Sequence, residues 1–70
     1  MHVKRRKAQQ SEATRSALLK AARKLFTDRG YADTATEEVV RRARVTRGAL
    51  YHHFRDKLDL FKAVLDAEEQ

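Results

Sequence analysis

The 70-residue sequence contains no cysteine, which excludes disulfide bonds and thiolate-bound metal as sources of stability. It contains no proline and only two glycines, so few residues interrupt a helix, and most of the others are good helix formers. No run of about 18 apolar residues is present, and the basic start MHVKRRK is not followed by the apolar segment of a secretory signal. We therefore predict a single, all-α domain in the cytoplasm.

Acidic residues are scarce in most of the chain. Residues 1–55 contain 14 Lys and Arg against 5 Asp and Glu, whereas residues 56–70 contain 2 against 5. A basic block on a small helical domain indicates a polyanionic partner, either nucleic acid or an anionic membrane. The acidic end is not expected to share that contact.

The first ten residues lack apolar periodicity and contain four consecutive basic residues. We predict that residues 1–10 form a flexible basic arm and that the domain proper spans residues 11–70. Two roles for the arm stay open: a solubilising leader, or an arm that follows DNA phosphates or enters the minor groove. In the second role the contacting residues are Lys4, Arg5, Arg6 and Lys7.

A first helix is expected from Ser11 or Thr14, either of which can cap it, to about Arg29. Gly30 then ends this helix in the left-handed conformation, which glycine tolerates best. Apolar residues at helical spacing form its buried stripe. These are Leu18, Ala21, Ala22, Leu25 and Phe26.

Two short helices are expected to follow, joined by a tight turn. Thr34 and Glu37 form a capping-box pattern for a helix that ends at about Arg42. Thr46 is a good N-cap for the next helix. Helices separated by so few residues must cross steeply, which predicts a helix-turn-helix.

A fourth helix is expected after Asp56, which caps it. The apolar residues between positions 58 and 67 occupy more than half of the circumference of this helix. One neighbouring helix cannot cover an arc that wide. We infer that part of this face meets a partner or a further part of the chain.

The stretch VTRGALYHHF, residues 45–54, carries the functional argument. Leu50 and Phe54 lie four residues apart and are expected to face the core. Gly48 lies in the first turn of the helix, where glycine costs roughly 1 kcal/mol relative to alanine. In a helix-turn-helix this end enters the major groove, so a residue without a Cβ lets the backbone approach a base or a phosphate. The neighbouring Arg47 can bind guanine O6 and N7 with a bidentate fork.

Three further polar residues of this stretch are candidates for DNA contact. Tyr51 and His53 can donate to phosphates, and His52 can reach a base edge or the backbone. Taken singly, each of them is equally well explained as an ordinary surface residue. Beside Arg47 and a basic arm, contact with DNA is the favoured interpretation.

Residues 34–61, TATEEVVRRARVTRGALYHHFRDKLDLF, together with residues 21–31, AARKLFTDRGY, resemble the DNA-binding domain of the tetracycline-repressor (TetR) family of bacterial transcriptional regulators. The similarity covers nearly all of the chain except the arm, and the combination of its motifs is specific. It implies a small helical bundle with a helix-turn-helix and a fourth helix. It also implies sequence-specific DNA binding, with repression as the leading expectation.

The resemblance implies roles for individual residues as well. Arg47 and Gly48 match positions that approach bases, and His52 matches a position that contacts bases or the backbone in some members. Phosphate contacts are implied for Thr34, Thr36, Thr46, Tyr51, His53 and Lys57.

One position departs from the family pattern, since the family usually has glycine where this chain has Arg44. If that position needs a positive φ, Arg44 is strained there. Arg44 is also a candidate for one more phosphate contact.

Members of the family normally continue into a larger helical domain that binds a small-molecule inducer and dimerises. The resemblance therefore implies double-stranded DNA with a palindromic operator as the partner, and a homodimer in the full-length protein. It implies an inducer that binds outside these 70 residues, and no membrane.

Other classes of function are less well supported. His52 and His53 are adjacent, so they point about 100° apart on a helix and cannot chelate one metal. No phosphate-binding loop or catalytic triad is visible, and we expect no enzyme, cofactor or metal. One alternative is that residues 1–29 form a basic amphipathic helix that binds a membrane surface or a protein partner, which leaves residues 34–61 without a role. Another is a helix-turn-helix that binds only protein.

Overall fold

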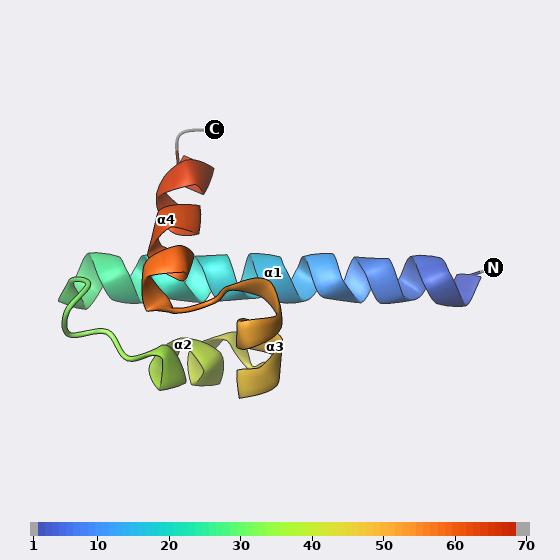
Figure 1. Ribbon diagram of the computed structural model, residues 1–70, viewed down its shortest axis with the longest axis horizontal. Coiled ribbons are helices and arrows are strands. Elements are labelled where there is room, and N and C mark those ends of the chain that lie inside the picture. Colours follow the sequence, from blue (N-terminus) through green and yellow to red (C-terminus); the bar gives the residue numbers. More distant parts are fainter. Residues whose placement is uncertain (1, 69–70) are drawn as a thin grey trace.

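Four helices make up the chain in the computed structural model, which describes the backbone of residues 2–68 and the side chains of residues 11–68. They are α1 (His2–Arg29), α2 (Thr36–Ala43), α3 (Arg47–His53) and α4 (Lys57–Glu68), and the described residues contain no strand. α2 and α3 lie along one side of α1, and α4 crosses α1 and leads away from that side (Figure 1). The predicted all-α bundle with a helix-turn-helix and a fourth helix is confirmed.

The start of α1 differs from the prediction. The helix begins at His2 rather than at Ser11 or Thr14, so residues 2–10 are helical where a flexible arm was expected. The physical reason is that this segment contains good helix formers and no glycine or proline, so the helix continues outward from its packed part. These turns project past the other helices (Figure 1). The side chains of Lys4, Arg5, Arg6 and Lys7 lie outside the described residues.

The core takes a stripe from α1 and one or two residues from each of the other helices. All five positions of the predicted stripe are buried. Facing them are Val39 of α2, Leu50 of α3, Phe54 just after α3, and Leu60 and Val64 of α4. Burying one Val, Leu or Phe side chain stabilises the fold by about 1.5–3 kcal/mol. Because α1 contacts all three other helices, it holds the helix-turn-helix and α4 in one unit.

The end of α1 is as predicted, but the start of α2 is not. Gly30 has a φ of 86°, and its N–H donates to the carbonyl of Phe26 at 2.8 Å. α2 begins at Thr36, after Ala35, which makes no side-chain cap. The capping box from Thr34 is therefore wrong, since the Thr34 hydroxyl is buried and shares its one hydrogen between the carbonyls of Gly30, at 2.8 Å, and Leu25, at 3.2 Å. These tertiary acceptors satisfy the hydroxyl better than the end of α2 would.

The turn between α2 and α3 is closed by a residue in the left-handed conformation. Arg44 has φ 61° and ψ 43°, and its N–H donates to the carbonyl of Arg41 at 3.2 Å. The sequence analysis expected strain at Arg44 if this position needs a positive φ, and the φ of Arg44 is indeed positive. Thr46 then caps α3 as predicted, because its Oγ1 accepts the N–H of Ala49 at 3.0 Å.

α4 begins with the predicted cap and keeps an uncovered apolar side. The Asp56 carboxylate accepts the N–H of Asp59 at 2.8 Å. Leu60 and Val64 are buried against α1, whereas Leu58 and Leu65 are 48% and 45% exposed. The wide apolar arc predicted from the sequence is thus only partly covered by the described chain. No helix among the described residues is long and apolar enough to cross a membrane.

Candidate nucleic-acid interface

One face of α3 carries the residues that the sequence singled out for reading DNA. Arg47, Gly48 and His52 are exposed, and Tyr51 keeps 43% of its surface exposed. Leu50, on the opposite face, is fully buried and fixes the helix to the core. An α-helix with its side chains is about 10–12 Å wide, which matches the major groove of B-DNA. The exposed face of α3 therefore has the size and polarity of a groove-reading surface.

Gly48 has no structural reason to be glycine. Its φ is not positive, and a Cβ built at this position meets only the Oγ1 of Thr46, at 3.9 Å, which is ordinary contact. An alanine here would fit the chain and favour the helix. The structure of the chain itself therefore does not account for the missing side chain at Gly48.

Two hydroxyl groups meet where α2 and α3 lie side by side. The Oγ1 of Thr36, in the first turn of α2, is 3.3 Å from the phenolic oxygen of Tyr51 on α3. Tyr51 is exposed and Thr36 is half-buried. Both were predicted phosphate contacts, and the structure brings them together at one point. Each hydroxyl can donate one hydrogen bond and accept two, so the pair can bind each other and an anionic oxygen.

The two histidines of α3 have different environments. Their rings lie 5.1 Å apart, nearly perpendicular, and His53 is half-buried next to Phe54 whereas His52 is exposed. Burial lowers the pKa of His53, and the positive charges of His52 and Arg15 lower it further. His53 therefore presents a neutral imidazole at neutral pH, with an N–H that can donate to a phosphate oxygen.

Arg15 of α1 belongs to this region, although the sequence analysis did not single it out. Its guanidinium lies 5.5 Å from the centre of the Phe54 ring, within the range of a cation–π contact. The contact joins α1 to the end of α3 and adds a positive charge beside His53. No local pattern could have revealed it, because 39 positions in the sequence separate the two side chains.

Two residues predicted to contact phosphate have their polar atoms turned inward. Thr34 is 1% exposed, and its hydroxyl is bound to backbone carbonyls, so the phosphate contact implied for Thr34 stays a prediction that this geometry does not favour. Lys57 directs its Nζ to the carbonyls of Tyr31, at 2.9 Å, and Thr34, at 3.0 Å. The remaining predicted phosphate residues, Thr36, Arg44, Thr46, Tyr51 and His53, lie on or beside the turn and α3.

Among the described side chains, ion pairs occupy some of the cations of α1 but not the two arginines closest to the start of α3. Three exposed ion pairs involve α1: Arg23 with Glu68, Lys24 with Asp28, and Arg29 with Glu38. Such pairs add little stability, but they reduce the positive charge that α1 offers to an anionic membrane. Arg44 and Arg47 take part in no ion pair within residues 11–68, so their charge is available to an external anion.

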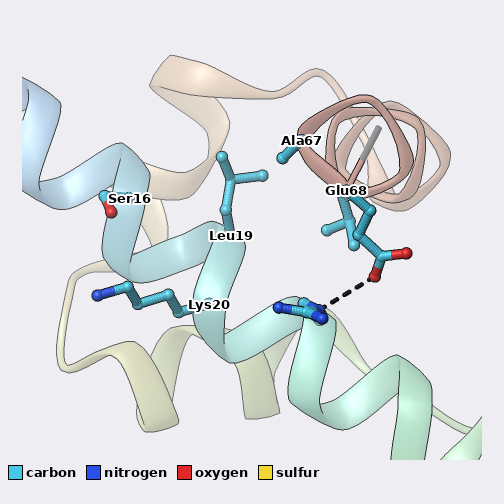
Figure 2. Close-up of a pocket in the computed structure, with 7 residues that line it drawn as sticks. Ser16, Leu19, Lys20, Ala67 and Glu68 are labelled. Atoms are coloured by element: carbon cyan, nitrogen blue, oxygen red, sulfur yellow. Dashed lines mark hydrogen bonds and ion pairs between the residues drawn. The ribbon is translucent and has the colours of Figure 1, made fainter. Parts of the chain in front are cut away.

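Other kinds of site find little support in the described part of the chain. No group of three metal-ligating side chains occurs there. A hollow of about 470 Å³ lies where α4 crosses α1, lined by residues that include Leu19, Lys20 and Ala67. Figure 2 shows it beside the bond between Glu68 and Arg23. None of the residues predicted to contact DNA lines this hollow.

Comparison with known proteins gives a consistent set of relatives. Residues 18–64 match the sequence model of a family described as bacterial regulatory proteins, tetR family. The chain is similar to the HTH-type transcriptional regulator AcrR of Shigella flexneri, with 40% identity over 65 residues, which are 93% of this chain and 30% of that protein. It is similar to the HTH-type transcriptional repressor BepR of Brucella suis biovar 1, with 44% identity over 63 residues, 90% of this chain and 30% of that protein. The HTH-type transcriptional regulator TtgR of Pseudomonas putida is 40% identical over 63 residues, again 90% of this chain and 30% of the relative. The chain thus spans about 30% of the length of these curated relatives.

Proposed function

Because the chain belongs to the TetR family of bacterial regulatory proteins, we propose that it reads a specific sequence of double-stranded DNA by placing α3 in the major groove. Arg47 donates its two parallel N–H groups to O6 and N7 of a guanine. Gly48 brings the helix backbone close to the neighbouring base or phosphate. His52, one turn further along the exposed face, reaches a base edge or the sugar-phosphate backbone.

The groups around α3 fix its register on the phosphates. Thr36 and Tyr51 offer paired hydroxyls, and Thr46 can donate its hydroxyl hydrogen outward while its oxygen caps α3. Arg44 adds a charge at the turn, and His53 adds a neutral N–H. The basic segment Lys4, Arg5, Arg6 and Lys7, at the far end of α1, is proposed as a further backbone or minor-groove contact.

One observation carries this proposal more than any other. Gly48 is an exposed glycine in a helix whose own structure would accept alanine. A helix keeps such a residue, at a loss of stability, when an external surface must approach its backbone. Arg47 beside it supplies the side chain that discriminates between bases.

The action of the whole protein is proposed from its relatives. BepR is named a transcriptional repressor, and we infer that this chain likewise serves a repressor acting on DNA in the bacterial cytoplasm. The relatives extend well beyond the matched region. We propose that the full-length protein is a homodimer which binds a palindromic operator, and that a small-molecule inducer binds outside these 70 residues.

Selection of bound duplexes from a random DNA library tests the proposal. The chain is used at moderate salt, with and without a fused dimeriser, and the Arg47→Ala variant is selected in parallel. We expect one enriched motif, doubled as a palindrome when the dimeriser is present, and loss of preference at one base pair in the variant. That loss should correspond to roughly 1–3 kcal/mol on the preferred site. Retained binding without any enrichment would refute sequence-specific reading by α3.

A further inference from the structure

Arg15 occupies the position at which the buried stripe of α1 continues beyond the core. It lies three residues before Leu18 and seven before Ala22, which are both fully buried, so the three side chains share one face of the helix. Arg15 itself is exposed. A charged residue at such a position can lay its apolar stem on the edge of the core and keep its guanidinium in water.

The fold brings this guanidinium to the end of α3. It lies 5.5 Å from the centre of the ring of Phe54, the residue that follows α3. His53, the last residue of α3, also responds to it: burial lowers the pKa of His53 most, and the positive charges of His52 and Arg15 lower it further. The charge of Arg15 therefore lies beside the end of the helix to which DNA reading is assigned.

This charge has no acidic partner among residues 11–68. Three other cations of α1 each form an ion pair there, namely Arg23, Lys24 and Arg29. Glu12 lies three positions before Arg15 on the same helix, and its negative charge acts on His53 in the opposite direction. Arg15 forms no ion pair with Glu12 and contacts Phe54 instead. The guanidinium is thus available to an external anion, and its planar fork fits a phosphate.

The two ends of α3 carry different groups. α3 has seven residues and is thus about 10 Å long, close to the width of about 12 Å of the major groove. When a helix of this length enters the groove, each of its ends comes near a phosphate strand. Arg44 and Thr46 lie at the start of α3, whereas Arg15 and His53 lie at its end.

We propose that Arg15 binds a DNA phosphate at the end of α3, beside the contact proposed for His53, so that α1 contributes directly to the interface. The inference rests on the proposed function and deepens it. Position 15 precedes residues 18–64, the region that matches the family model, so the assignment comes from the geometry of this chain.

Salt dependence tests the contact. Arg15→Met removes the charge and keeps a flexible apolar side chain that can pack on the Phe54 ring. Lys20→Met is the matched control, since it removes one exposed cation from another face of the same helix. Affinity is measured by fluorescence anisotropy over a series of salt concentrations, for the duplex enriched in the library selection and for a scrambled duplex. Circular dichroism checks that each variant is folded.

We expect Arg15→Met to reduce the slope of log affinity against log salt by about 0.9 relative to Lys20→Met. Its affinity should then be about eightfold lower than that of the control at about 0.1 M salt, and the gap should close near about 1 M. The loss should be the same on both duplexes, because a phosphate contact carries no sequence information. A slope equal to that of Lys20→Met would overturn the proposal, as would a loss confined to the selected duplex.

Arg15→Lys separates the charge from the packing on Phe54. It keeps a cation on a long stem, so we expect the slope of wild type and most of its affinity. If Arg15 served only to pack against Phe54, Arg15→Lys would show no advantage in slope over Arg15→Met. That result would contradict the phosphate contact.

Glu12→Gln keeps the test decisive even if the variants of Arg15 do not fold. It removes the acidic group that acts on the end of α3 and leaves Arg15 in place. We expect affinity at low salt to rise by about twofold, the size of a unit-charge repulsion across roughly 10 Å of water. Unchanged or weaker binding would overturn the proposal. Failure of the wild-type chain to prefer any duplex would instead refute the proposed function, so the two failures are distinguishable.

Discussion

The two glycines of the chain are needed for different reasons. Gly30 adopts a φ of 86°, which a residue with a Cβ rarely takes, and nothing lies within 4 Å of the position that a Cβ would occupy. Gly48 has no positive φ, and a Cβ there would meet only the Oγ1 of Thr46, at 3.9 Å, which is ordinary contact. The backbone thus requires the first glycine, while the second is accounted for only by the close approach of DNA that we propose.

This contrast predicts opposite effects of the same substitution. Gly48→Ala should raise the free energy of unfolding by up to about 1 kcal/mol, because alanine favours the helix. It should weaken binding to the selected duplex by at least about tenfold, since the added methyl keeps the backbone away from DNA. Urea unfolding and fluorescence anisotropy measure the two effects.

Gly30→Ala is the matched control for this experiment. It should lower the free energy of unfolding by about 1–2 kcal/mol, because alanine is strained in the left-handed conformation. The folded fraction should bind DNA with the affinity of wild type, since Gly30 is remote from α3 in the sequence and caps α1. Wild-type affinity in Gly48→Ala would show that no close approach occurs there.

His53 links stability to pH. Its pKa is lowered in the folded state by burial and by the positive charges of His52 and Arg15, from an ordinary value of 6.5. The unfolded chain therefore binds a proton at a higher pH than the folded chain does. The contribution of His53 is fully present above pH 6.5 and is lost as the pH falls through that value toward the lower folded pKa.

We expect His53→Asn to abolish this part of the pH dependence. The difference in free energy of unfolding between wild type and variant should fall as the pH decreases from 6.5. Urea unfolding at a series of pH values measures it, and the subtraction removes the contributions of the other titrating groups. A difference that stays constant from about pH 8 to pH 5 would contradict the lowered pKa.

Among the elements, the turn between α2 and α3 contains backbone strain at one residue, Arg44. Arg44 occupies the left-handed region, which costs a residue with a Cβ about 1–2 kcal/mol. The turn keeps this conformation because Val45 packs against the core and Thr46 caps α3 on the other side. The arginine adds a charge near the interface at the expense of stability.

Arg44→Gly should therefore stabilise the isolated chain. We expect a gain of about 0.5–1 kcal/mol, smaller than the strain itself because glycine also increases the entropy of the unfolded chain. For a domain of this size, the thermal midpoint should rise by about 2–8 °C. Arg44→Ala, which loses the charge but keeps the strain, should show no such gain. An equal rise in both variants would attribute the effect to charge rather than to the backbone.

Helix ends that depend on local residues were predictable. Gly30, Thr46 and Asp56 each act within a few residues of their own position, so their roles could be read from the sequence and are confirmed. The start of α1 was misplaced, because the preceding residues have no periodic apolar pattern but also contain nothing that stops a helix.

For the whole molecule, roles that depend on distant contacts could not be predicted. Thr34 resembled a helix cap, but its hydroxyl found carbonyls at the end of α1. The family resemblance implied a phosphate contact for Lys57, and nothing local indicated that it also donates to the carbonyls of a loop more than 20 positions earlier in the sequence. The core could be predicted because apolar periodicity survives tertiary folding, whereas polar groups pair with whichever partner the fold brings near.

In the molecule as a whole, the exposed polar residues of the helix-turn-helix and the exposed leucines of α4 lie on different sides of α1. α3 and the turn before it form the exposed polar side, while α4 on the other side of α1 exposes Leu58 and Leu65. The relatives are more than three times as long as the region they share with this chain. The polar side is the part of the molecule to which DNA binding is assigned.

The most direct test of this assignment is a map of the DNA-bound surface by amide chemical shifts. The isotope-labelled chain is titrated with the selected duplex, and changes are followed for each residue. We predict that the largest changes fall on Thr36 and on residues 46–53, with Lys20, Arg23 and Lys24 of α1 little affected. Changes centred on Lys20, Arg23 and Lys24, with α3 unchanged, would contradict the placement of α3 in the major groove.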